Sequence, residues 1–575
     1  MMTEKNGRVL LNALIALLTV LLALSIFKNI SYPLLWNDEA ETAMFATRIL
    51  TFGYPKVHDG KNVLNLLELP EKNLAVDGKR DAYVATVWGH FYFAVIGELL
   101  SRLTDDIYLK TALVRIPFGM AGFMGLLVIA LTGLPFFLNH KQRLCFLSAF
   151  LFLELLAIPL ILHLREVRYY SLALCLLSII LYLYSRYTIF RTLKPFFFIP
   201  LFTVTLVLFY NSFPPPFFAC VAAMGLTELI RFMKKKSWGE FSAATVPLLI
   251  AVVLVLPLLG FFHTAEISQA YRRFFHISGF IQARLLLDIV SFLWQYEFLA
   301  VILFARIAAL ALQRFLKFDC TSPGKGKKNK SVVKDSVQVQ AEYKKALLRM
   351  NASNFLSMLL LVYIGLASNI PLPVIFERYF IFLQPFLSII LLFDVFNMFS
   401  LISNVRLASV RIFVVVILLI MGGLFAAYGF NKIELLRNHI YELVHQYKGP
   451  LDYAIPYIQS NYKDTENLII ATNYEECSFM YYLGSKVIIG YVGNNLEEDM
   501  TMTPDIIIFR KRWAYTSKAE IFAPLFAKAG YKTVTFEVFD NPVNNIPQIK
   551  GPVHHLFKTK MAKTEKEALV LHARD

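Results

Sequence analysis

Long apolar runs recur along most of this 575-residue chain, and each is close to the length that crosses a membrane as a helix. A transmembrane helix needs roughly 20 predominantly apolar residues. On this basis we predict about eleven spans, at residues 9–28, 112–138, 143–163, 169–186, 195–212, 215–232, 242–262, 285–312, 352–370, 374–399 and 408–430. The first run has no small-residue cleavage site before Lys28, so we expect a retained span and not a signal peptide.

One further apolar stretch, Ala82 to Leu100, is predicted to lie along the membrane surface. Its Trp88, His90 and Glu98 are typical of an amphipathic interfacial helix. Counting this stretch as a span would also move every later loop to the opposite side of the membrane.

The basic residues gather in short loops between the apolar runs. If Arg8 is inside, Lys234 to Lys236 and Lys325 to Lys330 are inside as well, as the positive-inside rule requires. The formal net charge of +16 therefore reflects membrane insertion and does not indicate a nucleic-acid partner. We predict a multi-pass membrane protein with a cytoplasmic N-terminus and a C-terminus outside. The expected membrane is a bacterial plasma (inner) membrane, and the endoplasmic reticulum is the alternative.

The last part of the chain differs in character from the rest. Three short apolar strands are predicted at residues 467–471, 486–490 and 505–509, separated by helix-like stretches. The predicted fold is therefore an all-α polytopic membrane bundle with outer interfacial helices at residues 1–430, followed by a small outer-face soluble α/β domain at residues 431–575.

The overall composition agrees with this division. Hydrophobic residues make up 57% of the chain and charged residues only 17%, whereas a soluble domain has roughly 25% charged residues. Of the five cysteines, Cys477 alone lies in the C-terminal segment, and none lies in a predicted outer loop. We therefore expect no structural disulfide outside the membrane.

Two acidic residues follow the first span directly. Asn37 or Asp38 is predicted to cap a short helix that continues through Ile49, which fixes Asp38 and Glu39 close to the membrane surface. Such acids can simply cap the helix and compensate its dipole, a contribution of about 1 kcal/mol. They can also provide a catalytic carboxylate.

Several arginines are predicted at the same face of the membrane. Arg165 and Arg168 lie at an outer junction of two spans, where the i and i+3 spacing of a helix would let them face the same direction. Arg378 lies at another outer junction. Arginine suits a phosphate because its planar fork donates two hydrogen bonds at once. The alternative is that these side chains are interfacial anchors or pair with Glu166.

The order of these motifs resembles a known family. The chain is similar to the dolichyl-phosphate-mannose protein mannosyltransferases and lipid A aminoarabinose transferases, which are multi-spanning glycosyltransferases of the GT-C fold. The resemblance extends over roughly residues 10–430. It is carried by Asp38-Glu39-Ala40, Gly53-Tyr54-Pro55, Trp88-Gly89-His90-Phe91-Tyr92, Arg115-Ile116-Pro117, Arg165 to Leu172, and Glu377-Arg378-Tyr379.

The resemblance implies a polyprenyl-phosphate sugar as donor, a glycan, lipid or protein hydroxyl as acceptor, and inversion at the anomeric carbon. In that chemistry a carboxylate removes the acceptor proton, and cations stabilise the departing phosphate. The implied catalytic residues are Asp38, as base, and Glu39. The implied phosphate ligands are Arg165 and Arg168, with Arg115 and Arg378 as second choices.

The implied residues lining the substrate are Tyr169, His90 and Tyr379, although a histidine such as His90 is more often structural. No metal-ligand spacing is visible, so we expect no obligatory metal or cofactor, and a divalent metal ion is left open.

Two alternatives belong to other classes of function. A transporter or flippase of a lipid-linked sugar would also place arginines near the membrane surface, but transporters have polar residues near mid-span in broken helices. Here Glu297 and Arg306 are the main mid-span exceptions. The other alternative is a membrane scaffold without activity.

Overall fold

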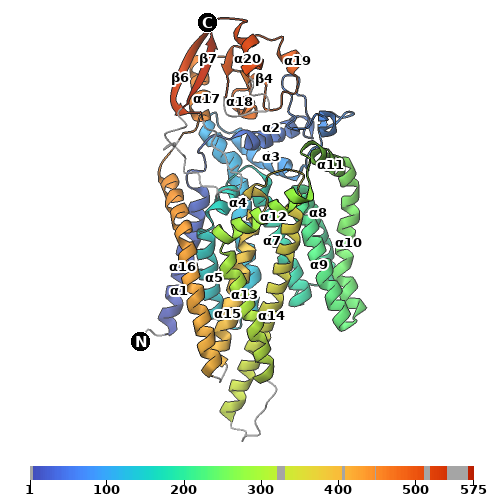
Figure 1. The fold of residues 1–575 in the computed structure, drawn as a ribbon, viewed down its shortest axis with the longest axis vertical. Helices are drawn as coiled ribbons and strands as arrows, with labels where there is room; N and C mark the ends of the chain where they lie inside the picture. Colours follow the sequence, from blue (N-terminus) through green and yellow to red (C-terminus); the bar gives the residue numbers. More distant parts are fainter. Residues whose placement is uncertain (1–3, 320–329, 405–407, 447, 511–518, 541–566) are drawn as a thin grey trace.

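The computed structural model describes residues 4–319, 330–404, 408–446, 448–510, 519–540 and 567–575. The molecule is elongated, with the N-terminus near the lower end of the helical bundle and the C-terminal domain at the upper end (Figure 1). The two ends of the chain therefore lie on opposite sides of the bundle, as an odd number of spans requires.

The bundle consists of long apolar helices. Within the described residues, nine helices are long and apolar enough to cross a membrane, or up to eleven if each of two bent pairs is one span. The chain is thus a multi-pass membrane protein, and the predicted number of about eleven equals the upper count. The helices that run along the bundle are α1 (Glu4–Phe27), α4 (Ile107–Gly133), α5 (His140–Leu155), α6 (Ile158–Leu164), α7 (Tyr169–Tyr184), α8 (Pro195–Ser212), α9 (Pro214–Lys235), α10 (Trp238–Phe261), α13 (Leu299–Asp319), α14 (Lys330–Ala367), α15 (Gln384–Asn404) and α16 (Ala408–Val444).

Two of the predicted spans are interrupted. The span predicted at 143–163 is the bent pair α5 and α6, with an angle of 78° between them. The span predicted at 285–312 is wrong as a single helix, because α12 (Gly279–Tyr296) ends before Phe298, whose φ of 56° breaks the helix ahead of α13. Figure 1 shows α12 lying across the upper end of the bundle while α13 descends. Hydropathy cannot detect such a break, since both sides of it are apolar.

Two further boundaries differ from the prediction. The span predicted at 374–399 begins as a helix only at Gln384, and the residues before it form the short 3₁₀ helices η4 (Glu377–Tyr379) and η5 (Ile381–Leu383). The last helix, α16, continues to Val444, past the predicted end at residue 430.

Short elements cover the upper end of the bundle. These are α2 (Asn37–Phe52), a small hairpin of β1 (Val76–Asp77) and β2 (Ala82–Tyr83), α3 (Gly89–Ser101) and α11 (Thr264–Phe274). The exclusion of Ala82 to Leu100 from the spans is confirmed, because α3 has only 13 residues and packs against α2 and α4.

The C-terminal domain is a five-stranded mixed sheet with helices. Its strands are β3 (Ile469–Thr472), β4 (Lys486–Ile489), β5 (Ile506–Ile508), β6 (Tyr531–Phe539) and β7 (Ala568–Arg574), in the order β4-β3-β5-β7-β6. The three predicted strands are confirmed as parallel neighbours, with Ile470 beside Val487 and Ile506, whereas the antiparallel β6 and β7 were not predicted.

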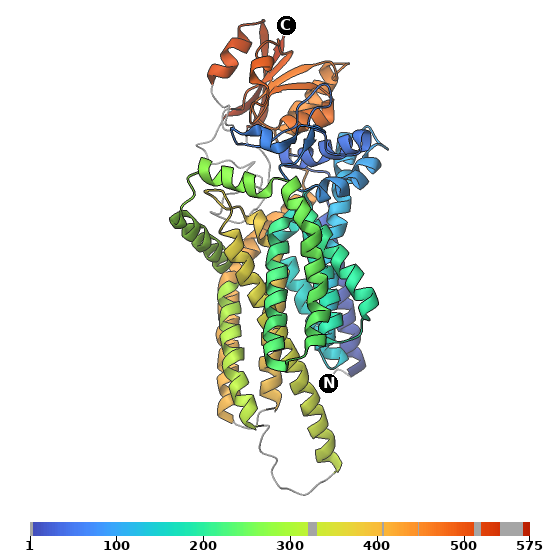
Figure 2. The same cartoon turned by 90° about the vertical axis from the view of Figure 1, so that its right-hand side faces the viewer.

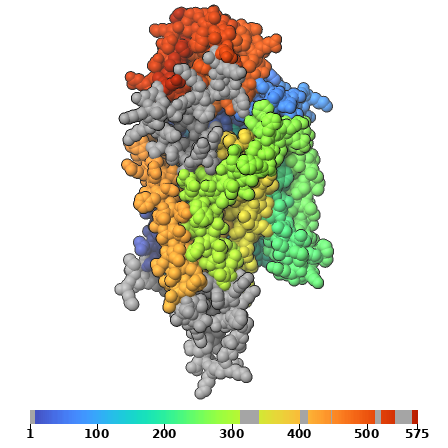
Figure 3. Space-filling view, viewed as in Figure 1, coloured from blue at the N-terminus to red at the C-terminus, as the bar shows by residue number. Residues whose placement is uncertain are grey.

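Four helices accompany this sheet. They are α17 (Leu451–Asn461), α18 (Glu476–Leu483), α19 (Leu496–Asp499) and α20 (Ala519–Phe526). Helix α18 packs against α2 of the membrane region. Figures 2 and 3 show the domain stacked above the bundle along its long axis, so the elements at the upper end lie between the two parts.

Candidate active site

Helix α2 lies at the junction between the bundle and the C-terminal domain (Figure 1). Ala40, Ala43 and Ala46 are fully buried, and this i, i+3 spacing lets α2 approach its neighbours closely. The predicted cap is wrong: the N-cap residue is Trp36, which makes no side-chain capping bond. The Asn37 side chain instead accepts a hydrogen bond from the backbone N–H of Cys477 at 3.2 Å, which ties α2 to α18.

Asp38 is the carboxylate that two arginines from distant parts of the chain reach. Its Oδ2 accepts a hydrogen bond from Arg378 Nη1 at 2.9 Å and lies 3.7 Å from Arg168 Nη2. The Asp38 side chain is 20% exposed, and those of Arg168 and Arg378 are 13% and 12% exposed. The group is thus mostly enclosed, yet a molecule at the membrane surface can reach it.

Glu39 points to a different partner. Its carboxylate is fully buried and accepts hydrogen bonds from Arg115 Nε at 2.8 Å and Nη2 at 2.5 Å, and from the backbone N–H of Val167 at 3.0 Å. Arg115 Nη1 also donates to the carbonyls of Ile30 and Pro33, at 2.9 and 2.7 Å. Both groups are therefore occupied within the protein, where they join α2, α4 and the turn before α7.

Glu41 shares the face of α2 that carries Asp38. Its Oε2 accepts a hydrogen bond from Arg168 Nη1 at 2.9 Å, and the same nitrogen donates to the Asp38 carbonyl at 3.0 Å. Burial raises the pKa of Glu41 to about 7, against the lowering effect of Arg168. Arg168 is thus held by two side chains of one helix.

Arg165 lies apart from Arg168. Arg165 Nη2 donates to the carbonyls of Lys28 and Asn29, at 3.0 and 2.9 Å, at the end of α1. The helical spacing predicted for the two arginines is wrong, because α6 ends at Leu164 and α7 begins at Tyr169. Residues 165–168 form the turn between these helices, so the two guanidinium groups reach different elements.

Aromatic rings form one wall beside the arginines. The His90 ring is 1% exposed and lies edge-on to Tyr169, at 5.7 Å between centroids. Burial, reinforced by Arg168, holds the pKa of His90 well below its usual range, so the ring is neutral. The Arg378 guanidinium lies over the rings of Phe376 and Tyr379, at 4.9 and 5.4 Å. The structure therefore brings the predicted lining residues to one place.

Two contributions were missed in the prediction of the site. The first is Glu41, whose spacing of three residues from Asp38 on a helix was the available signal. The second is the C-terminal domain: Ser478 Oγ donates to the Leu35 carbonyl at 2.8 Å, and Tyr482 OH accepts from the Leu35 N–H at 3.0 Å. No local pattern indicates these contacts, because more than 400 residues separate the partners.

The arrangement combines a partly exposed carboxylate with two guanidinium groups. Within the described residues, Arg168 Nε and Arg378 Nε have no hydrogen-bond partner, so each arginine retains a donor besides those that hold α2. Such a cluster can bind an anion and accept a proton at adjacent positions. Among the residues that the structure describes, no group of three or more His, Cys, Asp or Glu side chains could hold a metal ion.

The chain is similar to proteins of known structure. No protein family and no curated protein matches the sequence. Among solved structures, the chain matches the crystal structure of ArnT from Cupriavidus metallidurans bound to undecaprenyl phosphate, over 98% of both chains, with 13% identity and a TM-score of 0.47. ArnT is a lipid A aminoarabinose transferase.

Proposed function

We propose that this protein is a membrane glycosyltransferase that transfers a sugar from a polyprenyl-phosphate carrier to an acceptor hydroxyl, with inversion at the anomeric carbon. The observation that carries the proposal is the contact of Asp38 with both Arg168 and Arg378 at the end of a membrane bundle. An amphipathic donor can keep its prenyl chain in the hydrocarbon there while its sugar remains in water.

Asp38 is the proposed general base. It takes the proton of the acceptor hydroxyl as the acceptor oxygen forms a bond to the anomeric carbon. The bond from that carbon to the phosphate oxygen breaks, and the lipid phosphate leaves with the electron pair. Arg168 and Arg378 stabilise the phosphate charge by bidentate hydrogen bonding.

The resting contacts give this mechanism an order of events. Without a donor, Arg378 and Arg168 neutralise Asp38. A bound phosphate competes for the same guanidinium groups, which removes cationic partners from Asp38 and raises the basicity of its carboxylate. Donor binding therefore activates the base.

The remaining predicted residues have supporting roles in this proposal. Glu39 and Arg115 form a positioning pair that fixes the start of α2, and Arg165 anchors the end of α1. His90, Tyr169 and Tyr379 line the sugar site. The carrier resembles the undecaprenyl phosphate bound to ArnT in the solved structure. We place the site on the outer face of a bacterial plasma membrane.

The test is transfer by purified protein in proteoliposomes that contain a panel of radiolabelled polyprenyl-phosphate sugars and candidate acceptors. A glycosyltransferase releases polyprenyl phosphate and yields a labelled acceptor of higher mass. A transporter would instead move the intact lipid-linked sugar between leaflets without breaking its glycosidic bond. Flipping without product would refute the proposal.

The two charged residues predicted at mid-span do not favour transport. Arg306 is paired with Asp394 at 2.7 Å, and Glu297 with Lys432 at 2.7 Å. Each charge thus has a partner on a neighbouring helix, as buried structural ion pairs do.

A further inference from the structure

A second candidate site lies at the other end of the bundle. A cavity of about 650 Å³ is lined by residues of α4, α7, α9, α14 and α15 and includes the lower end of α9. Its volume is within the roughly 300–1,000 Å³ of small-molecule sites. The cavity shares no residue with the cluster around Asp38, so the proposed transferase site does not account for it.

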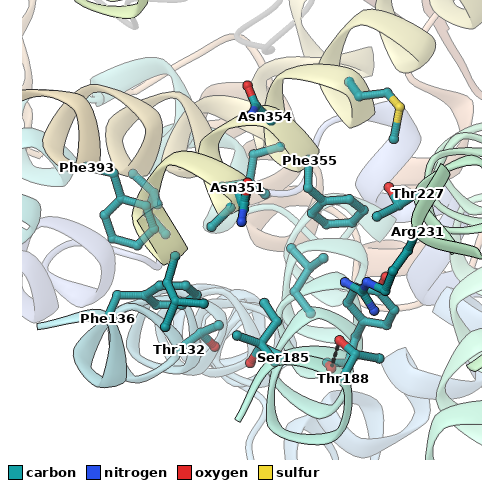
Figure 4. A pocket seen from close by; sticks show the side chains of 18 of the residues that line it. Thr132, Phe136, Ser185, Thr188, Thr227, Arg231, Asn351, Asn354, Phe355 and Phe393 are labelled. Atoms are coloured by element: carbon teal, nitrogen blue, oxygen red, sulfur yellow. Dashed lines mark hydrogen bonds between the residues drawn. The ribbon is translucent and has the colours of Figure 1, made fainter. Parts of the chain in front are cut away.

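The interior of the cavity is mainly apolar. Its walls include Ile129, Leu181, Leu356, Phe386 and Ile389. Figure 4 shows Phe136, Phe355 and Phe393 around the same space, with the amide of Asn351 among them. These walls suit a hydrocarbon chain.

The mouth of the cavity is cationic. Its lining includes the side chains of Arg191, Arg231, Lys234 and Lys235, with Glu240 as the acidic member. Arg231 pairs with the adjacent Glu228 at 2.7 Å, and Glu240 pairs both with Arg191 and with Lys235, the latter at 3.3 Å. Four positive charges therefore face two negative ones. Within the described residues, Lys234 forms no ion pair.

Exposed apolar side chains that can contact lipid lie next to the mouth of the cavity. Ile230 lines the cavity and is 36% exposed, and Met233 and Trp238 next to it are exposed as well. Exposed apolar side chains on a membrane helix face lipid, and tryptophan with lysine is typical of the boundary between lipid and water. An amphipathic molecule can thus enter from the membrane with its charge at the boundary.

We propose that this cavity binds an anionic, phosphate-bearing membrane lipid from the leaflet on the N-terminal side. The phosphate lies against Lys234, Lys235 and Arg231, and a hydrocarbon chain occupies the apolar interior. Anionic diacyl phospholipids and polyprenyl phosphates share this chemistry. A soluble anion would use only the mouth and would leave the apolar interior without a function.

The test measures lipid binding to the full-length protein in detergent by native mass spectrometry. The ligands are phosphatidylglycerol, undecaprenyl phosphate, phosphatidylcholine with the same acyl chains, and glycerol phosphate. The variant Lys234→Gln/Lys235→Gln removes two exposed charges at the mouth. Its matched control is Lys194→Gln/Lys236→Gln, which removes two exposed charges at the same end outside the cavity.

We expect the cavity variant to bind phosphatidylglycerol at least about ten-fold more weakly, as expected for lost hydrogen bonds to a charged group. The control should bind like the unmodified protein, and phosphatidylcholine and glycerol phosphate should bind weakly throughout. Undecaprenyl phosphate should also bind at the proposed donor site. Its binding to the cavity is therefore measured as the difference in affinity between the cavity variant and the control variant. The lipid whose binding the cavity variant weakens more, phosphatidylglycerol or undecaprenyl phosphate, is the preferred ligand of the cavity.

A cavity-filling variant, Ala352→Phe, provides an independent measurement. It leaves the charges in place and should abolish the lipid-specific binding while unfolding at a similar temperature without lipid. Equal losses in variant and control, equal affinity for glycerol phosphate and the lipids, or undiminished binding by Ala352→Phe would each overturn the proposal.

Discussion

The variant Asp38→Asn tests whether Asp38 acts as the general base. Asparagine keeps the size of the side chain but cannot accept the acceptor proton, so we expect turnover to fall roughly 10²–10⁴-fold. Donor affinity should be kept or increased, since the variant no longer competes for Arg378 and Arg168. Steady-state kinetics and donor titration measure both effects. Glu71→Gln, an exposed acid at the same end, is the control. Normal turnover in a folded Asp38→Asn protein would assign the base to Glu41.

Arg168→Lys and Arg378→Lys test the phosphate ligands. Lysine keeps the charge but loses the bidentate fork, so the KM for the donor should rise about ten-fold or more. Arg273→Lys changes an exposed arginine at the same end and should have no effect. Arg165→Lys should alter stability and not donor kinetics, because Arg165 binds the carbonyls of Lys28 and Asn29. A rise in donor KM for Arg165→Lys alone would reverse these assignments.

Glu476 gives the protein a pH-dependent stability. Burial raises its pKa to about 7, and one carboxylate oxygen has no hydrogen-bond partner. The folded protein therefore binds more protons than the unfolded chain between about pH 4.5 and pH 7, and stability falls as pH rises through that window. Glu476→Gln removes the charge, so it should raise the melting temperature at pH 8 more than at pH 5. The control variant Glu497→Gln changes an exposed acid of α19 and should show no such difference.

The residues that meet around Asp38 were predictable in part from short motifs. Asp38 and Arg378 were identified from acid and arginine motifs at outer junctions, and they meet in the structure. Arg165 and Arg168 were paired by helical spacing, yet a turn separates them. That turn is stabilised by a bond from the Val167 N–H to Glu39, 128 residues away. A contact at such a distance leaves no local pattern in the sequence.

At the scale of elements, the Glu39–Arg115 pair joins α2 to α4 without solvent access. Removing one partner leaves a buried charge uncompensated, which typically costs about 3–5 kcal/mol. Glu39→Gln and Arg115→Gln should therefore each lower the melting temperature strongly. The double variant should be less destabilised than the sum of the two, because neither charge is then left alone. Thermal unfolding of all four proteins measures the coupling, and strict additivity would contradict a direct pair.

Helical elements were predicted from apolar runs, and their interruptions were not. Runs of spanning length located the bundle helices, since a helix that crosses the membrane needs about 20 predominantly apolar residues. The break at Phe298 and the late start of α15 at Gln384 depend on backbone conformation and on contacts at the upper end. The strands β6 and β7 were missed because half-exposed antiparallel strands lack the continuous apolar run of a buried parallel strand.

At the scale of the whole molecule, the orientation of the bundle in the membrane can be tested, because its two ends face opposite sides. Gly239, at the start of α10, lies at the lower end and is exposed, with open space for a side chain. Glu497 of α19 is exposed in the C-terminal domain. We expect the end with Lys234 to Lys236 to be cytoplasmic, because positive loops are retained inside.

Single cysteines at these two positions, in a protein whose five native cysteines are replaced, test this orientation. An impermeant maleimide should label Glu497→Cys in intact cells and Gly239→Cys only after permeabilisation. Labelling of both in permeabilised cells is the control for accessibility. Reversed labelling would leave the cluster of Asp38, Arg168 and Arg378 intact, since the fold fixes it, but would place the acceptor in the cytoplasm. Labelling of both positions from outside would contradict the odd number of spans itself, because the two ends would then share one side.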